Sequence, residues 1–113
     1  MKRIIAFFLA IALIASSAWA TNKKSLANIG AADSYVQPIY VQGVFNLSIS
    51  GTWAGTVTLQ RSFDNGATWL DVSGYTGNAE SNSEYEPEGG VCYRAGFKAG
   101  QYTSGTAVIR ISQ

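Results

Sequence analysis

The chain has 113 residues, and its eight basic and seven acidic side chains leave a net charge of +1 at pH 7. This length limits it to one domain, and the near-neutral charge gives no electrostatic basis for binding nucleic acid. The absence of histidine excludes His-based catalytic triads, Cys–His dyads and imidazole metal sites. Cys92 is the single cysteine, so no disulfide can form within the chain.

The first 20 residues have the organisation of a bacterial secretory signal peptide. Residues 1–3 are basic at two positions, residues 4–15 are apolar throughout, and residues 18–20 match the A-x-A pattern that precedes a cleavage site. The apolar run is shorter than the roughly 20 residues of a membrane-spanning helix. We expect a signal-peptide helix that is cleaved after Ala20, and hence a secreted, periplasmic or cell-surface protein. An uncleaved N-terminal membrane anchor is the alternative.

Residues 21–33 are polar, rich in small side chains and without periodicity, which predicts a flexible N-terminal arm before a domain over residues 34–113. The mature chain would carry six basic and seven acidic side chains, a net charge of −1. A domain of this size buries only about 60–65% of its unfolded surface and is marginally stable by itself. We therefore expect a homo-oligomer or a larger protein assembly.

Beyond residue 33 the sequence consists of short apolar or alternating runs separated by glycine-rich turns, with no helical period. The alternation predicts the inward positions Phe45, Leu47, Ile49, Val57, Leu59, Leu70, Val72, Val91, Tyr93, Ala95, Phe97, Ala107, Ile109 and Ile111. The connections that we expect are 51–55, the turn at Asp64, the long segment 74–90, and 99–105. This spacing predicts an all-β protein: a single antiparallel β-sandwich, jelly-roll or Ig-like, of six to seven short strands.

The run from Ser62 to Trp69 fits the pattern S-x-D-x-G-x-T-W and lies where a hairpin turn is expected. Asp64 can accept hydrogen bonds from backbone N–H groups across the turn. Gly66 can adopt a positive φ without a Cβ penalty, and Trp69 can lie against the sheet. The sequence therefore predicts a structural hairpin formed by Ser62, Asp64, Gly66, Thr68 and Trp69.

Two other features could carry chemistry. Cys92 lies within an expected strand, where a buried, small hydrophobic role is favoured and an intermolecular disulfide is the alternative. Four glutamates lie in the expected long loop, at Glu80, Glu84, Glu86 and Glu88. Their spacing matches no calcium-binding loop pattern, so we favour a solvated acidic loop and leave calcium binding open. We predict no catalytic, cofactor-binding or metal-binding residues.

Aromatic side chains outside the hairpin offer stacking faces for a sugar or a partner protein. Trp53 lies in an expected turn and is the best candidate for exposure. The contacts that we predict for a ligand or partner are Trp53, Tyr75, Tyr85 and Tyr102.

Two resemblances rest on these residues. The hairpin residues Ser62, Asp64, Gly66, Thr68 and Trp69 resemble the Asp-box, or BNR-type, hairpin of sialidases and related propellers. That resemblance implies a turn geometry and not sialidase activity, because the chain holds one copy and is too short for a propeller. Over residues 45–113, the runs FNLSISGTWAGTVTLQRSFDNGATW, EPEGGVCYRAGFKAG and YTSGTAVIRISQ resemble small β-sandwich proteins encoded in bacteriophage and prophage genomes.

The second resemblance implies a virion component, such as a capsid decoration protein or a tail-associated piece. The signal-like N-terminus departs from that pattern, because most virion proteins assemble in the cytoplasm. We expect a non-enzymatic structural protein, secreted or in the virion, that self-associates or packs on a larger assembly without a cofactor. The alternative is a secreted carbohydrate-binding or adhesive module that contacts a surface carbohydrate.

Overall fold

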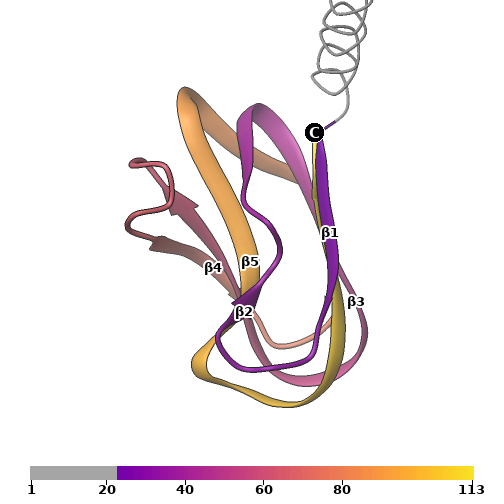
Figure 1. Ribbon diagram of the computed structural model, residues 1–113. Coiled ribbons are helices and arrows are strands. Elements are labelled where there is room, and N and C mark those ends of the chain that lie inside the picture. The colour runs from indigo at the N-terminus through magenta and orange to yellow at the C-terminus, as the bar shows by residue number, and fades with distance from the viewer. Residues whose placement is uncertain (1–22) are drawn as a thin grey trace, which may run out of the picture.

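The computed structural model describes residues 23–113, which fold into β-strands with no helix among them (Figure 1). The predicted signal peptide and its cleavage site lie outside these residues. The strands are β1 (Lys24–Ile29), β2 (Ser34–Tyr35), β3 (Ile39–Ser62), β4 (Leu70–Tyr75) and β5 (Ala79–Ser112). Their pairings are antiparallel, so the predicted all-β class is confirmed. Residues 23–113 contain no helix of the length and hydropathy needed to span a membrane.

Strands β3 and β5 are long because they bend at glycines and continue. The segments 51–55 and 99–105, which we expected to be separate connections, lie inside these strands. Gly55 and Gly105 have φ values of 133° and 82°, which favour glycine. A Cβ atom on Gly55 would lie 2.4 Å from the carbonyl oxygen of Gln101, and one on Gly105 would lie 2.3 Å from that of Thr52. Glycine thus allows each strand to bend while it stays paired with its neighbour.

The segments pair in a nested order, in which the first strand of the described chain pairs with the end of the last. From the outside inward, the pairs are β1 with 107–112, β2 with 96–97, 39–41 with 91–93, 43–49 with 79–86, and 57–61 with β4. Each inner pair is enclosed by the one before it. The pairing is therefore non-local, and distant parts of the sequence must meet before most ladders can form.

Two further ladders within β3 and β5 join these pairs into two layers. Residues 46–54 pair with 104–112, and residues 57–62 pair with 92–97. Layer A consists of β1, 104–112, 43–54 and 79–86 in that order. Layer B begins with β2 and residues 39–41, which both pair with 91–97, and continues with 91–97, 57–62 and β4. Figure 1 shows β1 in one layer and β4 in the other, with β3 and β5 passing between them.

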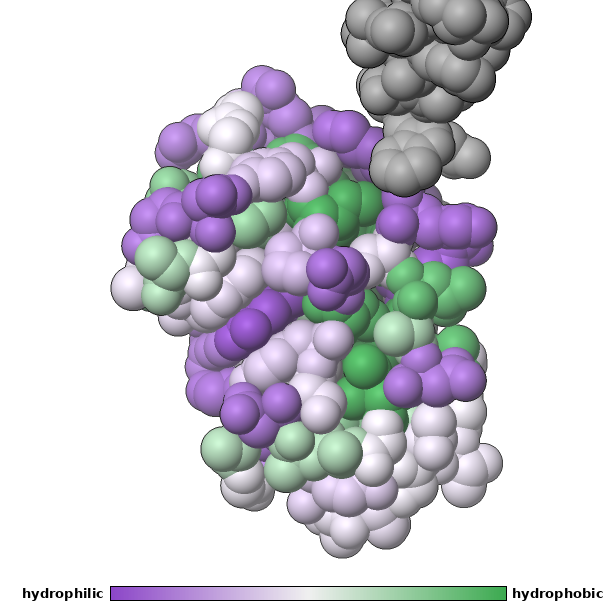
Figure 2. All heavy atoms as spheres, viewed as in Figure 1, coloured by the Kyte–Doolittle hydropathy of each residue, from purple (hydrophilic) through white to green (hydrophobic). Residues whose placement is uncertain are grey.

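The hydrophobic core lies between the two layers. Its buried members are Ile29, Val36, Val41, Phe45, Leu47, Ile49, Val57, Leu59, Val91, Tyr93, Ala95, Phe97, Ala107, Ile109 and Ile111. The rings of Phe45 in layer A and Tyr93 in layer B lie 4.6 Å apart and connect the layers. Hydrophobic residues also reach the surface in a band near β1, with hydrophilic residues around them (Figure 2). The predicted inward positions are confirmed in β3 and β5, because alternation there matches burial on one face.

The prediction that Leu70 and Val72 face the core is wrong. Their side chains are 51% and 40% exposed. Strand β4 pairs with β3 and with no other described strand, so it forms an edge of layer B. The register also shifts where Leu59 pairs with Ser73 and Gln60 with Asp71, which leaves Val72 without a partner. This bulge interrupts the alternation from which the inward assignment was made.

Two polar segments are strands where we expected irregular structure. The expected flexible arm contains β1, which pairs along its length with residues 107–112. The expected loop 74–90 is extended from Ala79 onward and pairs with residues 43–49. Neither segment shows an apolar alternation, because each is an edge strand with much of its surface in water. Backbone pairing with a more hydrophobic neighbour decides their conformation, and sequence pattern alone does not report that.

Candidate functional site

The outward surface of layer B carries a connected set of polar and aromatic side chains. In the ladder, Gln60 of β3 lies opposite Asp71 of β4 on one side and Arg94 of β5 on the other. Because directly paired residues share a face and the neighbouring Leu59 is buried in the core, all three side chains point away from the core. We define the Arg94 face as Asp33, Tyr35, Gln60, Trp69, Asp71, Arg94 and Lys98.

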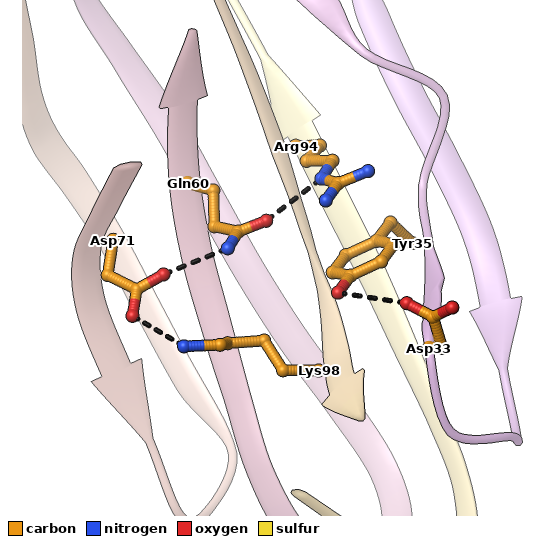
Figure 3. A network of polar contacts seen from close by, with 6 residues as sticks. All are labelled: Asp33, Tyr35, Gln60, Asp71, Arg94 and Lys98. Carbon is orange, nitrogen blue, oxygen red and sulfur yellow. Dashed lines mark hydrogen bonds and ion pairs between the residues drawn. The ribbon is translucent and has the colours of Figure 1, made fainter. Parts of the chain in front are cut away.

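Hydrogen bonds connect the polar members of the Arg94 face across three strands (Figure 3). Arg94 Nε donates to Gln60 Oε1 at 2.9 Å, and Gln60 Nε2 donates to Asp71 Oδ1 at 2.8 Å. Lys98 Nζ lies 2.7 Å from Asp71 Oδ2. The hydrogen bond from Gln60 and the one from Lys98 hold the pKa of Asp71 below its usual value. Gln60 is buried, and its amide fixes the orientation of both neighbours.

Two aromatic rings enclose the guanidinium of Arg94. Its Cζ atom lies 3.6 Å from the ring centroid of Tyr35 and 4.3 Å from that of Trp69, both within cation–π range. Burial lowers the pKa of Arg94 and raises that of Tyr35. Tyr35 Oη donates to Asp33 Oδ1 at 3.4 Å, a long contact at the rim of the face. The side chain of Arg94 is therefore held by two aromatic rings and by Gln60 at Nε.

The hairpin found in the sequence positions one of these rings. Asp64 Oδ1 accepts from the backbone N–H of Thr68 at 2.9 Å, and Asp64 Oδ2 accepts from Thr68 Oγ1 at 2.6 Å. Ser62 Oγ accepts from the N–H of Gly66 at 2.8 Å and donates to Asp64 Oδ1 at 2.7 Å. The two bonds from Thr68, and after them the one from Ser62, lower the pKa of Asp64 to about 2. The closed turn places Trp69 directly before β4, where its ring lies over the guanidinium of Arg94.

A second polar cluster joins the two layers at their seam. Glu86 of layer A is 1% exposed, and its Oε1 accepts from Tyr93 Oη at 2.7 Å and from Arg61 Nη1 at 3.2 Å. Its Oε2 accepts from the backbone N–H of Glu88 at 3.1 Å. Burial alone would raise the pKa of Glu86, but Tyr93, the Glu88 N–H and the charge of Arg61 together lower it. Burial and the bond to Glu86 raise the pKa of Tyr93 to about 12.

The other glutamates of the acidic segment have separate partners. Glu80 accepts from Ser48 Oγ, and Glu84 accepts from Ser81 Oγ and Tyr75 Oη. No three acidic, cysteine or histidine residues among residues 23–113 are placed to hold a metal ion. The expected solvated loop is wrong for Glu86, which is buried in a paired strand. Glu86 pairs with Gly43 of β3. The sequence alone does not indicate this pairing.

The aromatic residues predicted as contacts do not form one platform. Trp53 lies within β3, not in a turn; its Nε1 donates to Asn78 Oδ1 at 2.8 Å and its ring lies 5.6 Å from Phe97. Tyr102 also packs on Phe97, at 5.0 Å, and Tyr75 packs against the core. Tyr85, in contrast, is 62% exposed beside Val44 in the ladder.

Cys92 is buried, with its outward position between Ser62 and Tyr40 in the ladder of layer B. Burial raises the pKa of its thiol, which disfavours the reactive thiolate.

Three exposed apolar side chains lie in β4 or in the hairpin before it. Phe63, Leu70 and Val72 are 48%, 51% and 40% exposed. Arg61 connects two of them, because it pairs with Leu70 in the ladder and its guanidinium lies 4.9 Å from the ring centroid of Phe63. We call Phe63, Leu70 and Val72 the β4 edge patch. No pocket opens in the part of the surface that residues 23–113 form.

Comparisons of the chain with protein-family models, with curated proteins and with solved structures find no match.

Proposed function

We propose that this protein is a non-enzymatic structural module that assembles with copies of itself or on a larger protein assembly. The observation that supports this most directly is the β4 edge patch. The specific form that we propose is a phage-type virion decoration or tail-associated protein, for which the resemblance of residues 45–113 is the support. The compartment that we propose is the cell surface or periplasm, as residues 1–20 predict, with the virion as the alternative.

The nested pairing supports a sandwich of the jelly-roll type over an Ig-like one. In a jelly roll, eight segments form four antiparallel pairs that wrap into two sheets. Here β2 and residues 39–41, which both pair with 91–97, count as one segment, and the resulting eight segments pair from the outside inward and divide into layers A and B, four to each. Viral capsid domains and lectins both use this architecture, so it is compatible with assembly and with carbohydrate binding. The choice between them must come from the surface and not from the fold.

The outer edge of β4 favours association. An edge strand presents unpaired backbone groups, and proteins protect such edges with proline, lysine, bulges or inward-pointing charges. At the other edge of layer B the chain carries Pro38, and the outer segment of layer A turns Glu84 and Glu86 toward the interior. Strand β4 has its bulge and the exposed, ion-paired Asp71, but two more of its exposed side chains, Leu70 and Val72, are apolar. A second copy paired along β4 would cover this patch and continue layer B.

Matched leucine variants test this proposal. Leu70 and Leu26 are 51% and 53% exposed and lie on edge strands of different layers. We expect the wild-type protein to form discrete oligomers in sedimentation experiments, Leu70→Lys to shift them toward monomer, and Leu26→Lys to leave them intact. A wild-type protein that stays monomeric at high concentration, or equal dissociation by both variants, would contradict the proposal.

A further inference from the structure

The Arg94 guanidinium has donors that the described part of the protein leaves unused. Its Nε bonds to Gln60, whereas neither Nη1 nor Nη2 has a hydrogen-bond acceptor among residues 23–113. The two ion pairs in that part of the chain join Arg61 to Glu86 and Lys98 to Asp71, so no carboxylate among residues 23–113 lies within ion-pair distance of Arg94. Asp33 accepts from Tyr35, and its charge acts on Arg94 without forming an ion pair with it.

The unused nitrogen atoms reach solvent. No side-chain nitrogen or oxygen atom in residues 23–113 is both fully buried and without a partner. Since Nη1 and Nη2 of Arg94 have no partner there, they cannot be fully buried. The rings of Tyr35 and Trp69 both lie within cation–π distance of the guanidinium, and Nη1 and Nη2 carry the donors that remain for water or a ligand. The side chain is thus presented in one orientation before any ligand binds.

We propose that the Arg94 face binds a carboxylate-bearing sugar, such as a uronate unit of an acidic polysaccharide. Two parallel N–H donors of a guanidinium match the two oxygen atoms of a planar carboxylate. The partly exposed rings of Tyr35 and Trp69 lie beside the guanidinium and offer apolar contacts for the C–H groups of a sugar. Because the rings and Gln60 already fix Arg94, little conformational entropy is lost on binding.

This site differs from the aromatic platform that we predicted from Trp53 and the tyrosines. It is also independent of association through β4, because its central side chains, Tyr35, Trp69 and Arg94, do not belong to the β4 edge patch. A monomeric Leu70→Lys protein should therefore bind the same ligand. The failure of one proposal leaves the other standing.

The test compares an oligogalacturonate with its methyl ester by titration calorimetry. The ester keeps the sugar and removes the charge, and we expect it to bind at least tenfold more weakly. Arg94→Lys keeps the positive charge but loses the planar fork, and should weaken binding of the acid by about tenfold or more. Arg110→Lys, at an exposed arginine of layer A, is the matched control and should leave the affinity unchanged.

A measurement on the wild-type protein keeps the test valid even if Arg94→Lys fails to fold. In ¹H–¹⁵N spectra, the acid should shift the Trp69 indole and the Arg94 Nε–H signals and leave the Trp53 indole in place. Equal binding of acid and ester, unchanged affinity in Arg94→Lys, or an unmoved Trp69 signal would overturn the proposal. Binding of an acidic peptide through Arg94, without binding of the oligogalacturonate, would overturn the assignment to a sugar.

Discussion

Replacing Glu86 by glutamine should loosen the seam between the two layers. The carboxylate accepts three hydrogen bonds, from Tyr93, from Arg61 and from the backbone of Glu88. A glutamine side chain has one acceptor oxygen, and its NH₂ group would face a donor in place of the second carboxylate oxygen. If the amide oxygen keeps the bond to Tyr93, the N–H of Glu88 loses its acceptor, and Arg61 loses its opposite charge.

The expected loss follows from the burial of the partners. A hydrogen bond to a charged group contributes about 1.5–3 kcal/mol. The Arg61 side chain is 37% exposed, so water can solvate it when the ion pair to Glu86 is lost. The contribution of that ion pair to the free energy of unfolding is therefore near the range of about 0–1 kcal/mol for surface pairs. We expect Glu86→Gln to lower the free energy of unfolding at pH 7 by about 2 kcal/mol. For a domain of this size, that corresponds to a fall in Tm of about 8–16 °C.

Urea denaturation at several pH values tests both the magnitude and its origin. The folded protein holds the pKa of Glu86 below its ordinary value of 4.5. The stabilisation is therefore complete above that value and is lost as the pH falls through the lowered pKa. The difference between wild type and Glu86→Gln should shrink in acid, while Glu88→Gln, at an exposed position of the same strand, should match wild type throughout. Equal stability at pH 7, or a difference that persists unchanged in strong acid, would refute this reasoning.

Two other substitutions test how the Arg94 face is built. A Cβ atom on Gly96 would lie 2.0 Å from the carbonyl oxygen of Ser34, so Gly96→Ala should lower the free energy of unfolding, measured in urea, by about 1–3 kcal/mol. Gly77→Ala places its Cβ in open space and should be neutral. Similar losses in both variants would contradict the steric argument. Asp64→Ala removes both acceptors for Thr68 and should lower Tm and speed exchange of the Thr68 amide proton; unchanged exchange would show that the turn does not need the carboxylate.

The sequence predicted the core well because two-residue alternation has a direct physical meaning. A strand with one buried face must place apolar side chains at every second position, as 45–49 and 107–111 do. The same reasoning failed at Leu70 and Val72, because it assumes an unbroken register and a covering layer. It also missed β1, since a polar edge strand is held by the backbone of its neighbour and leaves little trace in its own side chains.

The Arg94 face could not be predicted for a related reason. Trp69 was identified through the local chemistry of the hairpin, but its contact with Arg94 depends on pairing between β3 and β5. Likewise, Glu86 resembles Glu80, Glu84 and Glu88 in the sequence, and only the ladder shows that it faces the interior. Residues that act together across strands carry no shared spacing along the chain, so their grouping appears only with the register.

The hairpin at Asp64 therefore matters through what it positions. Its hydrogen bonds close within the turn, and their consequence outside it is the placement of Trp69 over Arg94. On the other side, the absence of a side chain at Gly96 lets the backbone of β2 approach closely enough for Tyr35 to reach the same guanidinium. Asp71 of β4 completes the arrangement, because it orients Gln60, which in turn holds Arg94.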